Sequence, residues 1–259
     1  MNILNRYTLI TGGTEGIGLE LAKLFAADNH NLIIVARNQE KLKDIKIKFE
    51  KEYKITVEII QTDLCVDKFC EKIIKVVEEK KIIVDNLINN AGIGSFGFFS
   101  GAEDGFEEKL ININIVALTT LTKYFIKDMI KRGTGGILNV GSTAAFIGGP
   151  KMSMYYSSKA YVLSLTEAIH DEVKNLGIKV SCLCPGPVKT SFQEKSGIKK
   201  SEKSKKYLMD ASRVAEEAYL GFIKGKTIII PGYKNKLLIL ANKIIPRALS
   251  RKIILKNNN

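Results

Sequence analysis

The sequence lacks any long apolar run. None of its hydrophobic stretches approaches the roughly 18 uninterrupted apolar residues that a membrane-spanning helix requires. The opening residues, MNILNRYTLITGG, also lack the extended apolar segment and the small-residue cleavage site of a secretory signal. We therefore expect a cytoplasmic protein.

Cysteine and histidine are scarce as well, with four and two residues among 259. Cys65, Cys70, Cys182 and Cys184 show no spacing that is typical of zinc ligands, and the two distant histidines complete no ligand set. We therefore expect no metal site. In a reducing cytosol the four thiols should stay free.

Acidic residues are scarce only in the last part of the chain. The net charge is +13, and residues 189–259 hold 17 basic and 5 acidic residues, whereas residues 1–188 hold 23 and 22. Such basic segments contact nucleic acids, membranes or acidic partners, but they are more often solvated surface. Because no nucleic-acid motif or series of stacking aromatic residues accompanies this charge, we expect no nucleic-acid partner.

Short β-branched runs alternate with longer amphipathic stretches along the chain, and 45% of its residues are hydrophobic. This alternation is typical of βαβ units, and the length suits one domain spanning residues 1–259. It predicts a Rossmann-type, doubly wound α/β sheet of about seven parallel strands with helices on both faces. The predicted strands are 8–10, 31–36, 56–61, 86–89, 136–140, 179–184 and 227–230. The predicted helices are 16–28, 38–52, 67–80, 102–132, 155–176 and 211–224.

A glycine-rich loop connects the first predicted strand to the first helix. It reads Thr11-Gly12-Gly13-Thr14-Glu15-Gly16-Ile17-Gly18. Glycines allow a tight turn and let backbone amides approach a pyrophosphate, which the helix N-terminus favours electrostatically. A turn without a ligand is the alternative, but the strand–turn–helix context favours a dinucleotide site. We assign cofactor binding to Gly12, Thr14, Glu15, Gly16, Ile17 and Gly18.

The end of the second predicted strand indicates which dinucleotide binds. NAD sites carry an acidic residue there, which accepts hydrogen bonds from the ribose hydroxyls. Here the strand ends in Arg37 and Asn38, and a guanidinium is suited to a bidentate contact with a 2′-phosphate. We therefore expect NADP, with NAD as the second choice. If Arg37 is an ordinary exposed arginine, the preference is weak.

Tyr155 and Lys159 stand four residues apart near the start of a predicted helix, so their side chains share one helix face. Alone, such a pair is usually structural. Thirteen residues upstream, however, a predicted strand ends at Ser142, at the carboxyl edge where such sheets bind ligands. A lysine ammonium beside the phenol should lower the tyrosine pKa toward neutrality. Tyr156 is a rival phenol, but it is rotated by about 100° on the helix.

These motifs, with the spacings Thr-Gly-x-x-x-Gly-x-Gly and Tyr-x-x-x-Lys, resemble those of the short-chain dehydrogenase/reductase family. The resemblance covers at least residues 7–190, and the motifs follow the order found in the family. It implies that Ser142 holds the substrate oxygen, that Tyr155 donates or accepts its proton, and that Lys159 also contacts the nicotinamide ribose. It further implies that Asn114, and not the nearby Asn112, anchors a water in a proton relay to Lys159.

The resemblance also implies further cofactor contacts. Asp63 and Leu64 match the position at which the family meets the adenine ring. The element Asn90-Ala91-Gly92 matches one near the cofactor ribose, although Asn90 has a structural reading as a tie between strands. Beyond the sixth strand, the resemblance adds Pro185, Gly186, Val188 and Thr190, with Thr190 holding the nicotinamide carboxamide.

The implied reaction is the interconversion of a carbonyl and an alcohol by an NADP(H)-dependent oxidoreductase that forms a homodimer or homotetramer. A non-enzymatic NADP(H)-binding or redox-sensing protein on the same fold is the alternative. Such proteins usually lose the tyrosine or the lysine, and both are present here. Epimerase or dehydratase relatives use a longer substrate domain, for which 259 residues leave no room.

Two segments do not fit the alternation of strands and helices. We expect residues 190–206 to form a substrate lid whose lysines either recruit an anionic, carrier-linked substrate or are simply solvated. Residues 233–259 form a basic, apolar C-terminal tail in which Pro246 should interrupt any continuous helix. We expect this tail to pack on a neighbouring subunit or on the lid. Contact with a membrane surface is the alternative that the sequence favours less.

Overall fold

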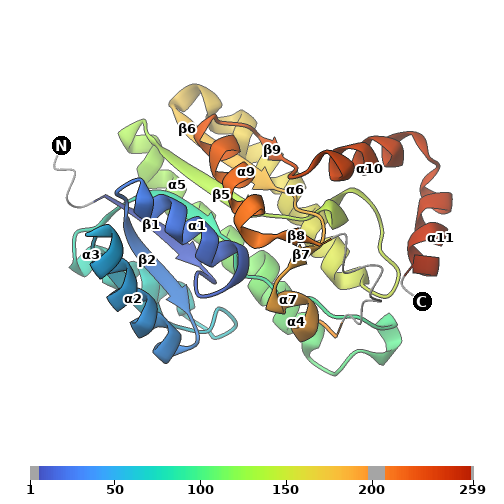
Figure 1. Ribbon diagram of the computed structural model, residues 1–259, viewed down its shortest axis with the longest axis horizontal. Helices are drawn as coiled ribbons and strands as arrows, with labels where there is room; N and C mark the ends of the chain where they lie inside the picture. Colours follow the sequence, from blue (N-terminus) through green and yellow to red (C-terminus); the bar gives the residue numbers. More distant parts are fainter. Residues whose placement is uncertain (1–5, 198–207, 258–259) are drawn as a thin grey trace.

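Seven parallel strands form the central sheet of the computed structural model, which describes residues 6–197 and 208–257 (Figure 1). Their order across the sheet is β3-β2-β1-β4-β5-β6-β9. The order reverses at β1 and β4, which is the switch point of a doubly wound sheet. The fold prediction is therefore confirmed, and each predicted strand is present. The strands are β1 (Arg6–Thr11), β2 (Asn31–Ala36), β3 (Val57–Gln61), β4 (Ile83–Asn89), β5 (Gly135–Val140), β6 (Ile178–Leu183) and β9 (Ile228–Ile229).

Helices cover both faces of the sheet because successive strand residues point in opposite directions. Leu9 and Ile33 belong to an apolar cluster with α3, α5 and the end of α6, whereas Ile10 and Ile34 pack with α1, α2 and α9. All four side chains are fully buried. These helices are α1 (Gly16–Ala27), α2 (Gln39–Tyr53), α3 (Phe69–Glu79), α5 (Leu118–Arg132), α6 (Ser153–Val173) and α9 (Ala211–Ile223).

The prediction of a single helix over residues 102–132 is wrong. A short 3₁₀ turn (Phe99–Gly101) comes first, then α4 (Phe106–Ile111), a π-helical segment (Asn112–Ala117) and α5. The residues of the π-helical segment are ordinary apolar and polar helix residues, so the periodicity alone does not reveal the change. A π-helical turn holds one more residue than an α-helical turn, and such turns often occur at functional sites.

The two segments outside the alternation are partly helical. In the expected lid, α7 (Ser191–Lys195) directly follows β7 (Val188–Lys189). β7 pairs in parallel with β8 (Met209–Asp210), which comes later in the chain. The lid residues 198–206 lie outside the described part of the chain, and with them Lys199, Lys200, Lys203, Lys205 and Lys206.

The C-terminal tail forms α10 (Tyr233–Ile244) and α11 (Arg247–Asn257), separated at Ile245 and Pro246. The predicted interruption at Pro246 is confirmed. The proline ring offers no N–H for the continuation of α10, and the Pro246 carbonyl accepts bonds from Leu249 N (2.9 Å) and Ser250 N (3.2 Å) instead. Within residues 6–197 and 208–257, no helix is both long and apolar enough to cross a membrane.

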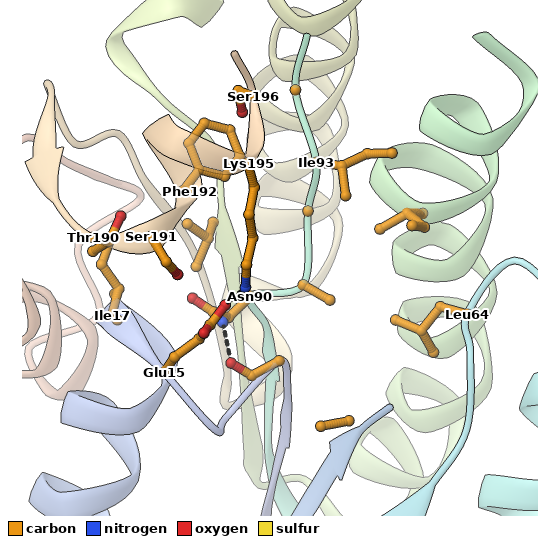
Figure 2. A pocket seen from close by; sticks show the side chains of 18 of the residues that line it. Glu15, Ile17, Leu64, Asn90, Ile93, Thr190, Ser191, Phe192, Lys195 and Ser196 are labelled. Atoms are coloured by element: carbon orange, nitrogen blue, oxygen red, sulfur yellow. Dashed lines mark hydrogen bonds and ion pairs between the residues drawn. The ribbon is translucent and has the colours of Figure 1, made fainter. Parts of the chain in front are cut away.

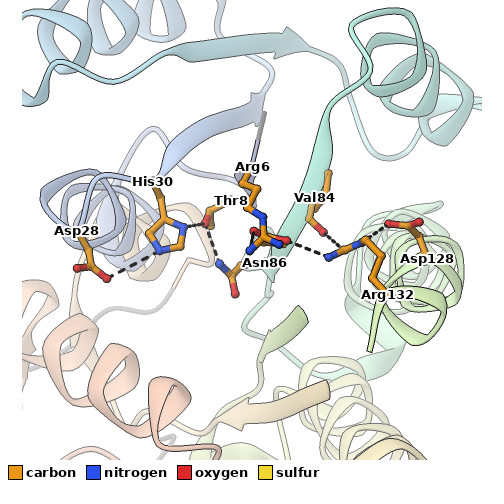
Figure 3. A network of polar contacts seen from close by, with 9 residues as sticks. Arg6, Thr8, Asp28, His30, Val84, Asn86, Asp128 and Arg132 are labelled. Atoms are coloured by element: carbon orange, nitrogen blue, oxygen red, sulfur yellow. Dashed lines mark hydrogen bonds and ion pairs between the residues drawn. The ribbon is translucent and has the colours of Figure 1, made fainter. Parts of the chain in front are cut away.

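Charged and polar side chains tie together the amino edge of the sheet, away from the carboxyl ends of the strands (Figure 3). Arg132 at the end of α5 donates to Asp85 (3.0 Å), Asp128 (2.7 Å) and the Val84 carbonyl (3.0 Å). Arg6 reaches the same Asp85 carboxylate at 3.4 Å. This network joins β1, β4 and α5, and so leaves the carboxyl edge free for a site.

A buried ladder of amides and hydroxyls crosses the sheet just below its carboxyl edge. Asn89 on β4 donates to Thr122 Oγ1 on α5 (3.0 Å) and to Asn139 Oδ1 on β5 (2.9 Å). Asn139 in turn donates to Thr166 Oγ1 on α6 (3.0 Å). All four side chains are buried. The ladder therefore fixes α5 and α6 relative to the strands that carry the site.

Because a buried donor without an acceptor is costly, we predict that Asn139→Ala lowers the free energy of unfolding by about 2–3 kcal/mol. Urea unfolding would measure this loss. The exposed Lys75→Ala, which removes only a surface ion pair, should stay within about 0.5 kcal/mol of wild type. Equal effects of the two substitutions would contradict the role of the ladder.

Candidate active site

A cavity of about 720 Å³ opens at the carboxyl edge of the sheet, between the glycine loop, the ends of β2, β4, β5 and β6, and α7. This volume suits a cofactor together with a small substrate. Of the residues expected from the sequence, the following line it: Gly12, Thr14, Glu15, Gly16, Ile17, Arg37, Asn38, Asp63, Leu64, Asn90, Ala91, Gly92, Ser142, Tyr155, Lys159, Pro185, Gly186, Val188 and Thr190.

Gly18 and Asn114 are the two expected residues that do not line this cavity. Gly18 is buried where α1 crosses the loop, and a Cβ atom there would lie 2.5 Å from the Gly12 carbonyl oxygen and would also meet the Asn90 amide. Its role is therefore close packing of the loop. We expect no direct contact of Gly18 with a cofactor from this position.

Asn90 holds the glycine loop against the end of β4. Its Nδ2 donates to the carbonyl oxygens of Thr11 (3.1 Å) and Gly12 (3.0 Å). In return, Thr11 Oγ1 accepts from the backbone N–H groups of Asn90 and Ala91, both at 3.1 Å. Gly12 has a φ of 67°, which favours glycine, and a Cβ atom there would lie 3.1 Å from Ala91 Cα. These hydrogen bonds show how Asn90 acts as a tie between β1 and β4.

One end of the cavity carries two basic side chains, each near a carboxylate. Arg37 follows β2, and its Nη1 lies 4.0 Å from Asp63 Oδ2. Asn38 caps α2 by accepting a hydrogen bond from Lys41 N at 2.9 Å. Lys41 also lines the cavity, with its Nζ 3.5 Å from Glu15 Oε2. We did not expect Lys41 from the sequence, although its place in the first turn of the helix after Arg37 was a usable signal.

The other end of the cavity brings three side chains together. Ser142 follows β5 and is buried, and its Oγ accepts from Ala144 N at 3.1 Å. Tyr155 and Lys159 lie on the first two turns of α6, where the Lys159 Nζ stands 5.7 Å from the centre of the tyrosine ring. The Lys159 ammonium is buried and donates to the Val140 carbonyl at 2.8 Å. Residues from two separate elements therefore converge on one point.

Burial sets the proton affinities of this group. It raises the pKa of Tyr155 to about 12, and a hydrogen bond with Ser142 opposes this rise only in part. Burial also lowers the pKa of Lys159 to about 8. The sequence-based expectation that Lys159 lowers the pKa of Tyr155 is therefore not met in this state. The physical reason is that desolvation dominates the phenol, while the ammonium is directed to the Val140 carbonyl.

Asn114 lies in the π-helical segment, behind the cavity wall formed by Gly92. Its amide pairs with the Ile93 backbone in both directions, accepting from N–H and donating to C=O, each at 2.9 Å. It also donates to Ser158 Oγ at 3.0 Å. A Cβ atom on Gly92 would lie 3.3 Å from Asn114 Oδ1 and 3.4 Å from Lys159 Nζ. The two polar groups therefore border the same small space beside Gly92.

Helix α7 contributes further cavity residues: Ser191, Phe192, Lys195 and the following Ser196 (Figure 2). The sequence had indicated only Lys195 among them, as one of the lid lysines that either recruit an anionic substrate or are solvated. Lys195 reaches across to form an ion pair with Glu15 of the glycine loop. Burial raises the pKa of Glu15, but hydrogen bonds with Lys195 and Ser191 outweigh it and lower the pKa. The ring of Phe192 packs 5.5 Å from that of Tyr155, centre to centre.

A second cavity of about 280 Å³ adjoins the first and shares Gly94, Phe106, Lys195 and Ser196 with it. Its other walls include three phenylalanines, Phe96, Phe98 and Phe99, and two acidic residues, Glu103 and Glu107. One cation, the Lys151 ammonium, lies 5.9 Å and 5.2 Å from the ring centres of Phe96 and Phe98. This chamber suits an apolar group next to the Tyr155 end of the main cavity.

The residues present fit a nicotinamide dinucleotide. A loop without side chains at Gly12 and Gly16 meets the N-terminus of α1, which favours a pyrophosphate, and both glycines line the cavity. Basic groups stand at one end of the cavity and a phenol with a hydroxyl at the other. Such an arrangement can hold a charged cofactor and transfer a proton beside it.

Comparison with known proteins agrees with this reading. A model of the short chain dehydrogenase family matches residues 6–201. Human dehydrogenase/reductase SDR family member 4 is 29% identical over 247 residues, covering 89% of this chain and 87% of that protein. Rat very-long-chain 3-oxoacyl-CoA reductase is 29% identical over 193 residues, but the match covers 73% of this chain and only 61% of the length of that protein.

Solved structures show the same likeness. A short-chain dehydrogenase from Sphingobium yanoikuyae in complex with NADPH has a TM-score of 0.82 at 30% identity, covering 92% of this chain and 94% of that one. The bulky-bulky ketone specific alcohol dehydrogenase from Comamonas testosteroni has a TM-score of 0.78 at 27% identity, covering 95% and 97%. The chain belongs to the short-chain dehydrogenase/reductase family of oxidoreductases.

Proposed function

We propose that this protein interconverts a carbonyl and an alcohol with NADP(H), using Tyr155 as the general acid and base. The convergence of Tyr155, Ser142 and Lys159 at one end of the glycine-loop cavity is the observation that carries this proposal. A binding-only protein would need none of these groups in one place. The non-enzymatic alternative is therefore not favoured.

The protonation states suit the reductive direction. With its pKa raised to about 12, the Tyr155 phenol is protonated at neutral pH and can donate to a substrate oxygen. Ser142, hydrogen-bonded to the phenol, can hold the same oxygen in place. When bound, the nicotinamide supplies the hydride that reduces the carbonyl carbon. Lys159, with its pKa lowered to about 8, can exchange protons near neutral pH.

A relay could resupply the proton to Tyr155. The small space beside Gly92 is bordered by Lys159 Nζ and Asn114 Oδ1. Asn114 is held rigidly by its paired hydrogen bonds to Ile93, so its orientation is defined. We propose that a water in this space connects Asn114 with Lys159.

The basic end of the cavity supports NADP over NAD. Arg37 and Lys41 both line it, and two cations can neutralise a 2′-phosphate better than one. The related enzyme from Sphingobium yanoikuyae was solved with NADPH. We propose that Arg37 provides the directed contact and Lys41 the additional charge.

The substrate class follows from the aromatic chamber. Phe96, Phe98 and Phe99 offer apolar surface beside Tyr155, which suits a bulky apolar group on the substrate. Relatives with similar sequences are named for long-chain 3-oxoacyl and bulky ketone substrates. We propose a ketone or a 3-oxoacyl compound with a large apolar substituent.

We predict that Tyr155→Phe lowers kcat for carbonyl reduction by a factor of about 100 to 10,000, because the proton donor is lost. The assay is NADPH oxidation with a panel of ketones and 3-oxoacyl thioesters. Tyr156→Phe is the matched control, because it removes the adjacent phenol on the same helix, and it should keep near wild-type activity. NADPH binding, measured by fluorescence, should survive in both variants. Full activity of Tyr155→Phe would refute the mechanism.

We further predict that Arg37→Ala raises the Kd for NADPH by about 10- to 100-fold, as expected for the loss of a charged hydrogen bond. The Kd for NADH should change little, because NADH has no 2′-phosphate. Lys41→Ala should show the same selectivity with a smaller effect. Lys43→Ala, an exposed lysine on the same helix, is the control. Equal losses for NADH and NADPH would rule out recognition of the 2′-phosphate.

A further inference from the structure

The last two helices expose an unusual amount of apolar surface. The described part of the chain has twenty exposed large apolar side chains, and eight of them lie on α10 and α11. Ile244 is the most exposed of these eight, at 81%. The eight are Tyr233, Leu237, Leu238, Leu240, Ile244, Leu249, Ile253 and Leu255.

On α10 these side chains form a stripe. Tyr233, Leu237, Leu240 and Ile244 are spaced at i, i+4, i+7 and i+11, so they fall within roughly 60° of the helix circumference. All four are more than half exposed. Leu249 and Ile253 make a similar i, i+4 pair on α11. We call these six residues the C-terminal apolar patch.

The helices are docked on the body of the protein by their other faces. On α10, Ile239 is buried at 4% exposure, and Asn235 donates to the Pro231 carbonyl at 2.7 Å. On α11, Ser250 is buried, and the Arg251 stem lies against Gly148, in the loop between Ser142 and Tyr155. The patch is therefore carried by two docked helices, α10 and α11, which lie at one end of the molecule (Figure 1).

The two helices themselves carry charge of one sign. Residues 233–259 contain seven basic residues and no acidic residue. On α10, Lys234 lies on one side of the stripe and Lys236 and Lys243 lie on the other, where a helical wheel places them about 60° to 90° away. Long lysine stems can follow apolar surface and place their ammonium groups in a polar layer above it.

The apolar stripe and the positive charge together indicate which kind of partner the patch binds. Two copies of this chain would bring seven positive charges against seven, and charged residues are depleted at the centre of protein interfaces. A nucleic acid would match the charge but not the apolar stripe. An anionic bilayer surface matches both, because its headgroups attract cations and its acyl chains accept leucine and isoleucine.

We propose that the C-terminal apolar patch docks this protein on the surface of an anionic lipid bilayer. The stripe on α10 and the pair on α11 enter the boundary between headgroups and acyl chains. The surrounding lysines and arginines contact the lipid phosphates. From the sequence alone, packing on a neighbouring subunit or on the lid is the favoured role of this tail, and the test below distinguishes subunit packing from lipid binding.

The test is flotation of the full-length protein with vesicles of phosphatidylcholine, with and without phosphatidylglycerol. We expect the protein to float with the anionic vesicles and to stay in solution with the neutral ones. Leu237→Ser/Leu240→Ser/Ile244→Ser and Lys236→Gln/Lys243→Gln/Lys252→Gln should each lower the partition coefficient at least about 10-fold. Matched controls are Leu220→Ser, an exposed leucine on α9, and Lys75→Gln on α3, which should partition like wild type.

Three results would overturn the proposal. The first is wild-type protein that stays in solution with anionic vesicles. The second is equal flotation of the triple leucine/isoleucine variant and wild type, which would indicate adsorption by charge alone. The third is a lower oligomeric state of that variant by light scattering, without any vesicle binding by wild type, which would assign the patch to a subunit interface. Thermal unfolding and NADPH binding show whether each variant is folded.

A spectroscopic measurement avoids variants that remove apolar residues. The chain has no tryptophan, so Leu240→Trp introduces a single reporter into the stripe. Its emission should shift to the blue with anionic vesicles and should be quenched by lipids brominated in their acyl chains. Leu220→Trp should show neither effect. An unchanged spectrum of Leu240→Trp in the presence of anionic vesicles would refute insertion of the stripe.

Discussion

The close contact between Asn90 and the glycine loop is the constraint on which the site depends. The Asn90 amide needs the carbonyl oxygens of Thr11 and Gly12 within hydrogen-bonding distance, and no side chain at Gly12 or Gly18 fits in the space that remains. This contact joins β1 and β4 at the point where the order of strands reverses. The loop is thereby held at the carboxyl edge, and the cavity forms there because the chain leaves β1 and β4 toward opposite faces of the sheet.

The buried ladder of amides and hydroxyls fixes the positions of Ser142, Tyr155 and Lys159 relative to the sheet. Asn89 and Asn139 connect α5 with α6 through the sheet, so the helix that carries Tyr155 and Lys159 keeps its register against Ser142. Burial then sets the chemistry. It raises the pKa of Tyr155, so the phenol keeps its proton at neutral pH, and it brings the pKa of Lys159 toward neutral pH. The amino edge carries the ion-pair network instead, so the charges that stabilise the sheet lie away from the site (Figure 3).

The surface of the molecule divides into regions with different physical character. The cavity is closed on one side by α7, whose Lys195 pairs with Glu15 across the dinucleotide loop. The chamber beside it combines phenylalanine rings with charged side chains, and the Lys151 cation lies over two of the rings. The C-terminal helices combine exposed apolar residues with charge of one sign. In the two proposals made above, an apolar substrate and an anionic lipid surface are bound by separate parts of one chain.

The sequence by itself determined the sheet, its strands and which residues lie at the carboxyl edge around the cavity. The reason is that periodicity and motif spacing can be read from neighbouring residues in the sequence. It also determined the break at Pro246, since that residue cannot continue a helix. Only the tertiary structure decided which groups are desolvated. Several features depend on how segments far apart in the chain pack together. They are the raised pKa of Tyr155, the π-helical segment around Asn114, the ion pairs of Lys41 and Lys195 with Glu15, and the exposure of the stripe on α10. Helical spacing shows which residues share a face, but only the packed fold decides whether that face meets protein or solvent.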